Sequence, residues 1–251
     1  MNKVTIYGER CSGTNYLEQL LLSNFDVEIV WDYGWKHFFG FNELNNSDDV
    51  LFIGIIRNLI DWINSFYRDK HHLPFHLTEN IDVFLNDTFY SVIYEDNVPH
   101  EIMTDRNIET NEKYKNIFEL RLTKNKYLVD LMPYLVTNYC LITYDDLCDN
   151  FIDTMNKFRD YGLKIKNNIE FPLNITYYKT QKHTTFIKKE NEISKEKIMK
   201  NIITNNELLF YEKILFPKLF IEVINHTIDT NHTIDTNQPV KQNVISMIFT
   251  I

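Results

Sequence analysis

Two short segments of the chain carry residue types that could bind phosphate. Residues 4–17 read V-T-I-Y-G-E-R-C-S-G-T-N-Y-L, which predicts a strand, a loop with two glycines that have four residues between them (Gly8 and Gly13), and a helix. A glycine loop between a strand and a helix can hold phosphate through backbone N–H groups. The P-loop consensus continues with Lys and then Ser or Thr, whereas this chain has Thr14 and Asn15. The loop therefore predicts anion binding without the lysine that contacts a γ-phosphate.

A second segment combines an arginine with a serine. It reads F-I-G-I-I-R-N-L-I-D-W-I-N-S-F-Y-R over residues 52–68, and the apolar run predicts a strand that ends at Arg57 before a helix. Ser65 follows eight residues later, about two helical turns along. A guanidinium at the end of the strand can bind two oxygens of a phosphate, and the hydroxyl can bind a third. The alternative is an arginine that caps a sheet edge beside a solvated serine.

The composition is that of an acidic globular protein. The 251 residues are 44% hydrophobic, and 26 basic against 35 acidic residues give a net charge of −9. This charge opposes a nucleic-acid backbone or an anionic membrane surface, so we expect neither as a partner and expect anionic ligands to be bound locally. There are three cysteines in no paired metal spacing, no basic and apolar leader, and no apolar run near the ~20 residues of a membrane span. These features favour a cytoplasmic protein without a disulfide framework or a bound metal.

Apolar strands alternate with helical patterns along the first two thirds of the chain. Strands are predicted at residues 4–7, 27–30, 50–56 and 139–144, and helices follow roughly at 58–69, 78–90, 111–132 and 149–161, the last ended by Gly162. This alternation predicts an α/β fold, a three-layer sandwich with a mainly parallel central sheet. Ligands of such folds bind at the carboxyl ends of the strands.

The last third of the chain is less regular. Residues 163–192 predict a loop with a basic group that includes Lys188 and Lys189, and two helices are expected near 194–203 and 205–222. The hexapeptide H-T-I-D-T-N then occurs twice in succession, and two copies of so short a polar unit cannot bury a core. We expect one α/β domain over residues 1–224 and a low-complexity tail over 225–251.

Taken together, these segments resemble the sulfotransferases that use 3′-phosphoadenylyl sulfate (PAPS). S-G-T-N-Y at residues 12–16 is similar to the family's first loop, P-K-S-G-T-T-W, and Arg57, Asn58 and Ser65 match its pattern of R-N, six residues and S. I-T-Y-D-D-L at residues 142–147 is similar to the family's Y-E-D-L after a core strand. The resemblance covers residues 4–160 in the same order. It implies an α/β fold with a P-loop-like loop that binds phosphosulfate.

The resemblance also implies a donor site. The 5′-phosphosulfate would be held, through backbone N–H groups and the helix dipole and without a metal, by Arg10, Cys11, Ser12, Gly13, Thr14 and Asn15. Arg57 and Ser65 would bind the 3′-phosphate, and the late basic loop with Lys188 and Lys189 would close over it. Cys11 stands where the family has Lys or Arg. That departure leaves open which cation neutralises the bridging oxygen during transfer.

The segment G-W-K-H-F-F at residues 34–39 offers a replacement for that cation. The family often carries a Lys and a His near this place, and here Lys36 and His37 are adjacent. The resemblance implies that His37 is the base that takes the acceptor proton, and that Lys36 or Arg10 is the stabilising cation. The alternative is a surface lysine beside a half-buried histidine. Adjacent residues of a strand point to opposite faces, so both reach the site only if the chain turns at Gly34 or just after His37.

Other polar groups are weaker candidates. The three histidines of H-H-L-P-F-H at residues 71–76 have no carboxylate or cysteine that completes a metal site, and they fit an acceptor site or a plain loop better. Asp145 and Asp146 match an acidic turn that is structural in the family. Cys11, at a helix start, could be a reactive thiol but fits better as a small core-lining residue.

The sequence thus predicts a sulfotransferase that moves a sulfuryl group from PAPS to a hydroxyl or amine and releases the bisphosphate PAP. The acceptor is expected to be a small molecule or a carbohydrate, whose identity depends on loops that neither the fold nor the donor site specifies. A P-loop-type kinase or nucleotidase is one alternative, against which the missing lysine and the lack of an Mg²⁺-binding Asp after a strand count. A non-catalytic nucleotide-binding protein with the same fold, suggested by Cys11, is the other.

Overall fold

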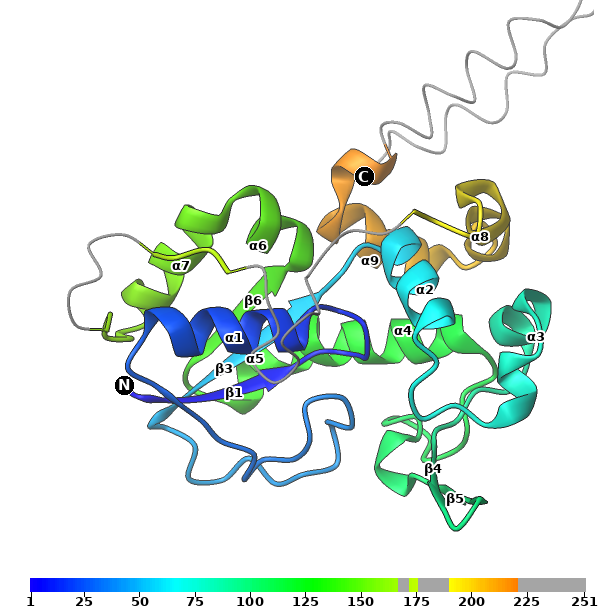
Figure 1. Cartoon of the computed structure of the whole chain (residues 1–251), viewed down its shortest axis with the longest axis horizontal. Helices are drawn as coiled ribbons and strands as arrows, with labels where there is room; N and C mark the ends of the chain where they lie inside the picture. The colour runs from blue at the N-terminus through cyan, green and yellow to red at the C-terminus, as the bar shows by residue number, and fades with distance from the viewer. Residues whose placement is uncertain (167–171, 176–189, 221–251) are drawn as a thin grey trace, which may run out of the picture. The chain divides into compact units, whose positions relative to one another are not determined.

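The computed structural model describes residues 1–166, 172–175 and 190–220 (Figure 1). The chain separates into two units, Met1–Leu215 and Phe216–Ile251, and all elements discussed below belong to the first. The expected tail from residue 225, its repeat and the basic pair Lys188 and Lys189 lie outside the described residues. No helix in the described part of the chain is long and apolar enough to cross a bilayer.

A four-stranded parallel sheet forms the centre of the first unit. Its strands are β1 (Lys3–Tyr7), β2 (Glu28–Ile29), β3 (Val50–Ile56) and β6 (Tyr139–Thr143), in the spatial order β2-β1-β3-β6. Ile6 lies opposite Ile53, and Ile53 lies opposite Cys140. Every residue of β3 is buried, as expected for a parallel strand covered on both faces. The predicted α/β fold with a mainly parallel central sheet is confirmed.

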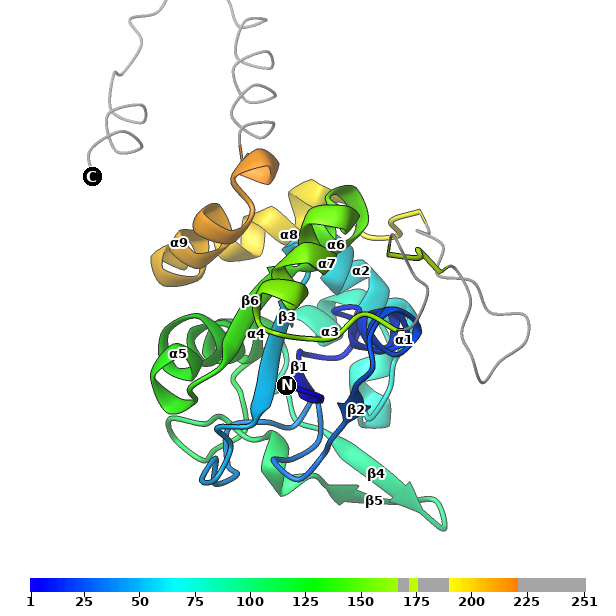
Figure 2. The same cartoon turned by 90° about the vertical axis from the view of Figure 1, so that its left-hand side faces the viewer.

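Helices cover both faces of this sheet (Figures 1 and 2). One face packs through Val4, Ile6 and Ile53 against α1 (Thr14–Asn24), α6 (Tyr144–Asp149) and α7 (Phe151–Asp160). On the other face lies α4 (Ile117–Lys126), which continues into η3 (Tyr127–Leu131) and α5 (Met132–Leu135). The side chains of each strand alternate between these two layers because successive Cβ atoms point to opposite faces. The central strands are therefore buried, and only their ends are free to carry a site.

The helix after β3 is fixed at its first turn by a side chain of the sequence motif. α2 (Leu59–Arg68) is capped by Asn58, whose Oδ1 accepts a hydrogen bond from the Asp61 amide at 2.9 Å. The Asn58 amide nitrogen donates to both carboxylate oxygens of Asp145 at 3.1 Å. Asn58 thus ties the start of α2 to the acidic turn that follows β6, and it gives Asp145 a structural contact.

Several predicted elements differ in extent from the observed ones. The single helix expected over residues 78–90 is wrong: the chain forms η1 (Phe75–Thr78) and α3 (Ile81–Asn86) there. The helix expected from residue 111 begins only at Ile117, because Asn116 caps it by accepting from the Phe118 and Glu119 amides at 3.0 Å. The other shortened elements are β2 and the two late helices, α8 (Lys195–Ile202) and α9 (Asn206–Leu215).

An antiparallel hairpin is present that the sequence reading missed. It pairs β4 (Val92–Glu95) with β5 (Val98–Glu101), and η2 (Met103–Asp105) follows it. Its two-residue turn consists of Asp96 and Asn97, with φ angles of 50° and 65°. Asp and Asn tolerate this left-handed conformation better than other non-glycine residues, so they suit a two-residue hairpin turn.

Gly13 and Gly162 offer a matched test of the glycine loop. Both have positive φ, 96° and 87°, but a Cβ on Gly13 would lie 2.3 Å from Cδ2 of Tyr144, whereas a Cβ on Gly162 would meet nothing within 4 Å. We expect Gly162→Ala to lower the free energy of unfolding by about 1–2 kcal/mol, the cost of a left-handed alanine. Gly13→Ala adds the steric clash and should cost about 2–5 kcal/mol. Denaturant unfolding of both variants measures the difference, and equal losses would contradict the close contact with Tyr144.

Candidate functional site

A cavity of about 660 Å³ opens where β1, β3 and β6 end. Because parallel strands end at the same edge of the sheet, the three loops that follow them meet there. Most of the residues singled out by the sequence line this one cavity: Arg10, Cys11, Gly13, Thr14, Asn15, Lys36, His37, Arg57 and Ser65. The cavity therefore brings together three segments that are distant in the chain: the glycine loop, residues 36–37, and Arg57 with Ser65.

The glycine loop presents backbone groups to this cavity. Cys11 and Gly13 adopt left-handed conformations, with φ of 63° and 96°, and α1 begins directly after them. The first N–H groups of a helix have no partner within the helix and carry the positive end of its dipole. Ser12 is an exception among the loop residues. It is buried, and it borders a separate internal cavity of about 10 Å³ together with Glu9 and Lys124.

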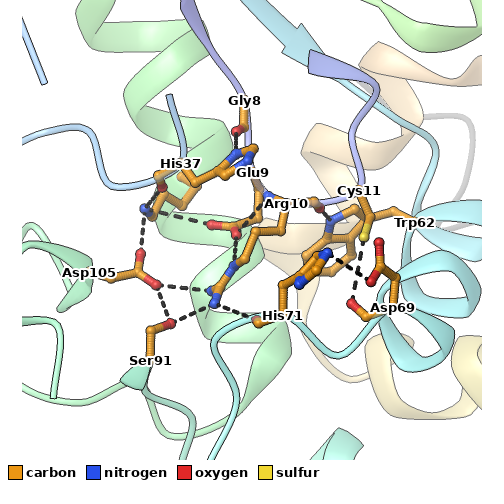
Figure 3. A network of polar contacts seen from close by, with 11 residues as sticks. Gly8, Glu9, Arg10, Cys11, His37, Trp62, Asp69, His71, Ser91 and Asp105 are labelled. Atoms are coloured by element: carbon orange, nitrogen blue, oxygen red, sulfur yellow. Dashed lines mark hydrogen bonds and ion pairs between the residues drawn. The ribbon is translucent and has the colours of Figure 1, made fainter. Parts of the chain in front are cut away.

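The guanidinium of Arg10 is committed to a buried polar network (Figure 3). Its nitrogens donate to Glu9 Oε1 at 2.7 Å, to Ser91 Oγ at 2.7 Å and to Asp105 Oδ2 at 2.9 Å. It also donates to the His71 carbonyl at 3.3 Å, and its side chain is 2% exposed. These partners hold the loop after β1 in place. Each of the three guanidinium nitrogens is thus engaged within the protein.

Lys36 reaches the start of α1 from a different segment. Its ammonium donates to Asn15 Oδ1 and to Glu18 Oε2, the latter at 3.2 Å. It also lies 5.5 Å and 5.3 Å from the ring centres of Trp31 and Trp35. Aromatic faces attract a cation, so the ammonium is held between the indoles and the first turn of α1.

A tight turn allows Lys36 and His37 to line the same cavity. The Phe38 amide donates to the Trp35 carbonyl at 3.0 Å, which makes Lys36 and His37 the two central residues of a turn. Gly34, just before the turn, has a φ of 105°. Adjacent side chains in a turn need not point to opposite faces. The chain thus turns at Gly34 and again across Lys36 and His37, which is the condition under which both side chains can reach one site.

His37 is held as a neutral base. Its Nδ1 lies 2.7 Å from the Gly8 carbonyl, which can only accept, so Nδ1 carries the proton and Nε2 remains an acceptor. Burial lowers the pKa of His37 to about 3, and the nearby charges of Arg10, Lys36 and Lys124 act in the same direction. The imidazole is therefore uncharged at neutral pH.

Arg57 and Ser65 lie in the cavity with the loop. Arg57 Nη1 donates to the Cys11 carbonyl at 3.2 Å, and the guanidinium carbon lies 4.7 Å from the centre of the Tyr144 ring. Arg57 Nε is buried and has no hydrogen-bond partner among the described residues. Buried donors are normally satisfied, so an orphaned Nε next to a cavity indicates a place for an anion.

The cysteine and histidines of the site do not form a metal centre. Burial raises the pKa of the Cys11 thiol to about 12, so it is a neutral thiol rather than a reactive thiolate. His71 Nε2 lies 3.0 Å from Asp69 Oδ1, while His76 packs on Tyr90. Over the described residues there is no group of three His, Cys, Asp or Glu side chains that could hold a metal ion.

The cavity is also lined by His71 and His72, which the sequence offered as weaker candidates for an acceptor site, and by residues that the sequence reading did not select: Tyr16, Trp35, Arg68, Asp69 and Tyr144. Tyr16 lies in the segment that follows β1, and Tyr144 lies in the segment that follows β6. Both segments carry sequence motifs described above. Their aromatic character beside a phosphate loop was the available signal. Arg68 and Asp69 carry no such signal, because charged residues at the end of a surface helix are common.

Comparison with known proteins gives a weak likeness to a solved structure. No protein-family profile matches the chain, and no curated protein matches it. Among solved structures, the chain is similar to mouse sulfotransferase SULT7A1 complexed with PAP, with a TM-score of 0.35 and 13% sequence identity. The match covers 64% of this chain and 58% of the mouse chain. At this level the likeness carries no argument about activity, so the function proposed below rests on the geometry of the site.

Because the pKa of His37 is lowered in the folded protein, the free energy of unfolding should fall as the pH falls. Below the unfolded pKa near 6.5 the unfolded chain binds a proton at this histidine, and the folded chain does not until the pH approaches about 3. Acidification from pH 7 to 4.5 should therefore cost the parent protein more stability than His37→Asn, in which the amide can still donate to Gly8. Denaturant unfolding at several pH values tests this. Parallel pH slopes for the two proteins would show that His37 is not held neutral.

Proposed function

We propose that the chain transfers a sulfuryl group from PAPS to a hydroxyl or amine acceptor without a metal. One observation carries this proposal: a glycine loop at a helix N-terminus, an arginine with an orphaned Nε and a neutral histidine line the same cavity. The loop would bind the 5′-phosphosulfate of the donor, and Arg57 would bind its 3′-phosphate. His37 would take the proton of the acceptor.

The 5′-phosphosulfate of PAPS would bind at the loop. The backbone N–H groups at the start of α1, including those of Thr14 and Asn15, supply donors and the positive end of the helix dipole. Lys36 adds a full positive charge beside Asn15. Such preorganised positive groups stabilise the charge that develops on the bridging oxygen as the sulfuryl group departs.

The 3′-phosphate would bind between Arg57 and Ser65. Arg57 offers the free Nε donor, and Ser65 offers a hydroxyl on the facing helix α2. The aromatic rings of Tyr16 and Tyr144, 6.1 Å apart, lie at the same end of the cavity and give a nucleobase a surface for packing. A nucleotide with phosphates at both the 3′ and 5′ positions would thus have a separate binding group for each phosphate and an aromatic surface for its base.

The transfer step needs one proton acceptor. The acceptor hydroxyl gives its proton to His37 Nε2 as its oxygen attacks sulfur, and the bond between sulfur and the bridging oxygen breaks. The products are the sulfated acceptor, PAP and a protonated His37, which returns its proton to solvent. Lys36, held by Glu18 and the two indoles, stabilises the negative charge on the leaving phosphate.

The cavity favours a polar acceptor. Among the described residues that line it none has an aliphatic side chain, and the lining includes Trp35, whose ring contacts His37, together with Lys36, His71 and His72. Apolar acceptors need apolar surface to bury. A small molecule or carbohydrate with several hydroxyl groups fits this lining better, since the side chains can satisfy its hydrogen bonds.

The proposal predicts binding of PAP without metal. Calorimetry in EDTA should detect PAP binding, and ATP with Mg²⁺ should bind more weakly, because the loop has Thr14 and Asn15 where a P-loop has Lys and then Ser or Thr. Arg57→Ala should weaken PAP binding by about 2–4 kcal/mol, the scale of losing one partner of a desolvated charged hydrogen bond. Adenosine 5′-monophosphate, which lacks the 3′-phosphate, is the matched ligand and should be nearly indifferent to the substitution.

Two outcomes would count against the donor site. Affinity that collapses in EDTA and returns with Mg²⁺ favours a kinase or nucleotidase. PAP that binds parent and Arg57→Ala equally well removes Arg57 from the 3′-phosphate.

A further outcome concerns catalysis and not the donor site. Tight PAP binding without any transfer of radiolabelled sulfate to a panel of sugars, phenols and amines favours the non-catalytic alternative.

The two residues of the turn should differ in their kinetic effects. His37→Ala should lower kcat by about 10²–10⁴-fold while the Kd of PAP changes little, because a positioned base acts on the proton and not on the donor. Lys36→Ala should lower kcat and also weaken PAP, since its charge faces the bound phosphate as well as the transition state. Steady-state kinetics with calorimetry separates the two. A His37→Ala variant with unchanged kcat would remove the base from the proposal.

A further inference from the structure

Helix α4 carries two buried cations that each hold the backbone of a site residue. Arg121 and Lys124 lie three residues apart on the same side of the helix, and their side chains are 3% and 2% exposed. Lys124 Nζ donates to the His37 carbonyl at 2.7 Å, and Arg121 Nη2 donates to the Arg57 carbonyl at 2.8 Å. One rigid helix thus contacts both ends of the candidate site.

The Lys124 contact belongs to a nearly neutral buried cluster. Lys124 Nζ also donates to Asp105 Oδ1 at 2.7 Å and lies 3.6 Å from Glu9 Oε2, while Arg10 bonds the other oxygens of Glu9 and Asp105. Two cations and two carboxylates offset one another, so the buried cluster carries little net charge. Figure 3 shows Asp105 and Glu9 gathered beside His37 in this cluster. The ring of His37 is held at Gly8 and its main chain at Lys124, so the imidazole has little freedom to turn.

The Arg121 contact belongs to a separate pair. Its guanidinium forms a two-bond ion pair with Glu212 on α9, at 2.5 Å and 2.8 Å. The remaining hydrogen of Nη2 reaches the Arg57 carbonyl, and the guanidinium carbon lies 5.0 Å from a ring centre of Trp62. Glu212 is fully buried. The pair therefore fixes the end of β3, from which the Arg57 side chain extends toward Cys11 and Tyr144.

We propose that α4 positions the two functions of the site separately: Lys124 sets the base His37, and Arg121 sets the anion-binding Arg57. The inference rests on the roles proposed above for His37 and Arg57. Neither cation lies at the reacting atoms, so each acts as a positioning residue. A shift of about 1 Å in a reacting group can lower the rate on the order of 10²-fold. Because a hydrogen bond to the carbonyl fixes the main chain of His37 or Arg57, it also limits how far the side chain of that residue can shift.

The test uses charge-balanced double variants, because removing one partner of a buried pair leaves the other uncompensated. Lys124→Met with Asp105→Asn should lower kcat by about 10–10²-fold and change the Kd of PAP less than about threefold. Arg121→Met with Glu212→Gln should raise the Kd of PAP by about tenfold or more and change kcat at saturating donor less than about threefold. The single conservative variants Lys124→Arg and Arg121→Lys should restore part of each loss.

Two controls separate positioning from general destabilisation. Lys126 is also on α4 and pairs with Glu109 and Glu207, but it contacts no site residue, so Lys126→Met should leave both kcat and Kd unchanged. Asp105→Asn alone isolates the effect of that substitution. The imidazole NMR signal of His37, assigned with His37→Asn, gives a readout independent of activity. It should move in the Lys124 double variant and stay in place in the Arg121 double variant.

The outcomes are distinct. Equal losses of kcat and affinity in both double variants, or no loss in either, would overturn the proposal. A His37 signal that responds equally to both, or to neither, would also overturn it, whether or not the protein turns over PAPS. If the parent binds no PAP but the NMR signals respond as expected, the positioning holds and the proposed function fails instead.

Discussion

The parallel pairing of β1 with β3 and of β3 with β6 is the constraint on which the site depends. Because all three strands run in one direction, their carboxyl ends at Tyr7, Ile56 and Thr143 share an edge of the sheet. The glycine loop, Arg57 and Tyr144 follow these ends directly. Burial of both faces of the sheet fixes the register, since a slip of one residue would turn every apolar side chain to the wrong layer. The stability of the core therefore also sets the distances between the groups that face the cavity.

An acidic protein must concentrate positive charge locally to bind a nucleotide with several negative charges. The net charge of −9 works against this over long distances. The cavity has one carboxylate in its lining, Asp69, and that group is paired with His71. The carboxylates of Glu9, Asp105 and Glu212 are instead buried behind the cavity against Arg10, Lys124 and Arg121. The negative charges of these three carboxylates are thus neutralised by the residues that position the site. Arg57 faces the cavity, and Lys36 faces it while paired with Glu18.

The sequence predicted the strands that form the sheet and a little over half of the described residues that line the cavity, because these belong to short local patterns. Local patterns could not predict the buried clusters. Lys124 and the His37 carbonyl are 87 residues apart, and a lysine in a helical pattern is ordinarily read as exposed. The helix limits depended on side-chain caps such as Asn116, which an Asn-rich chain offers at many positions. The β4–β5 hairpin was missed although Asp96 and Asn97 carry its turn signal, and its second strand contains Pro99, a residue that is uncommon within strands.

The absence of a loop lysine has a physical consequence for catalysis. A lysine at position 11 would approach the leaving phosphate from the loop itself, on a flexible four-carbon chain. Lys36 comes instead from the turn that also carries His37, and its ammonium is held by Asn15, Glu18 and two indole faces. In the proposed transfer, its position would cost little reorganisation as the transition state forms. The same cation lowers the pKa of the neighbouring imidazole, whereas the negative charge of a bound donor would raise it. His37 would therefore become an effective base only after the phosphosulfate occupies the loop, which couples activation of the acceptor to the presence of the donor.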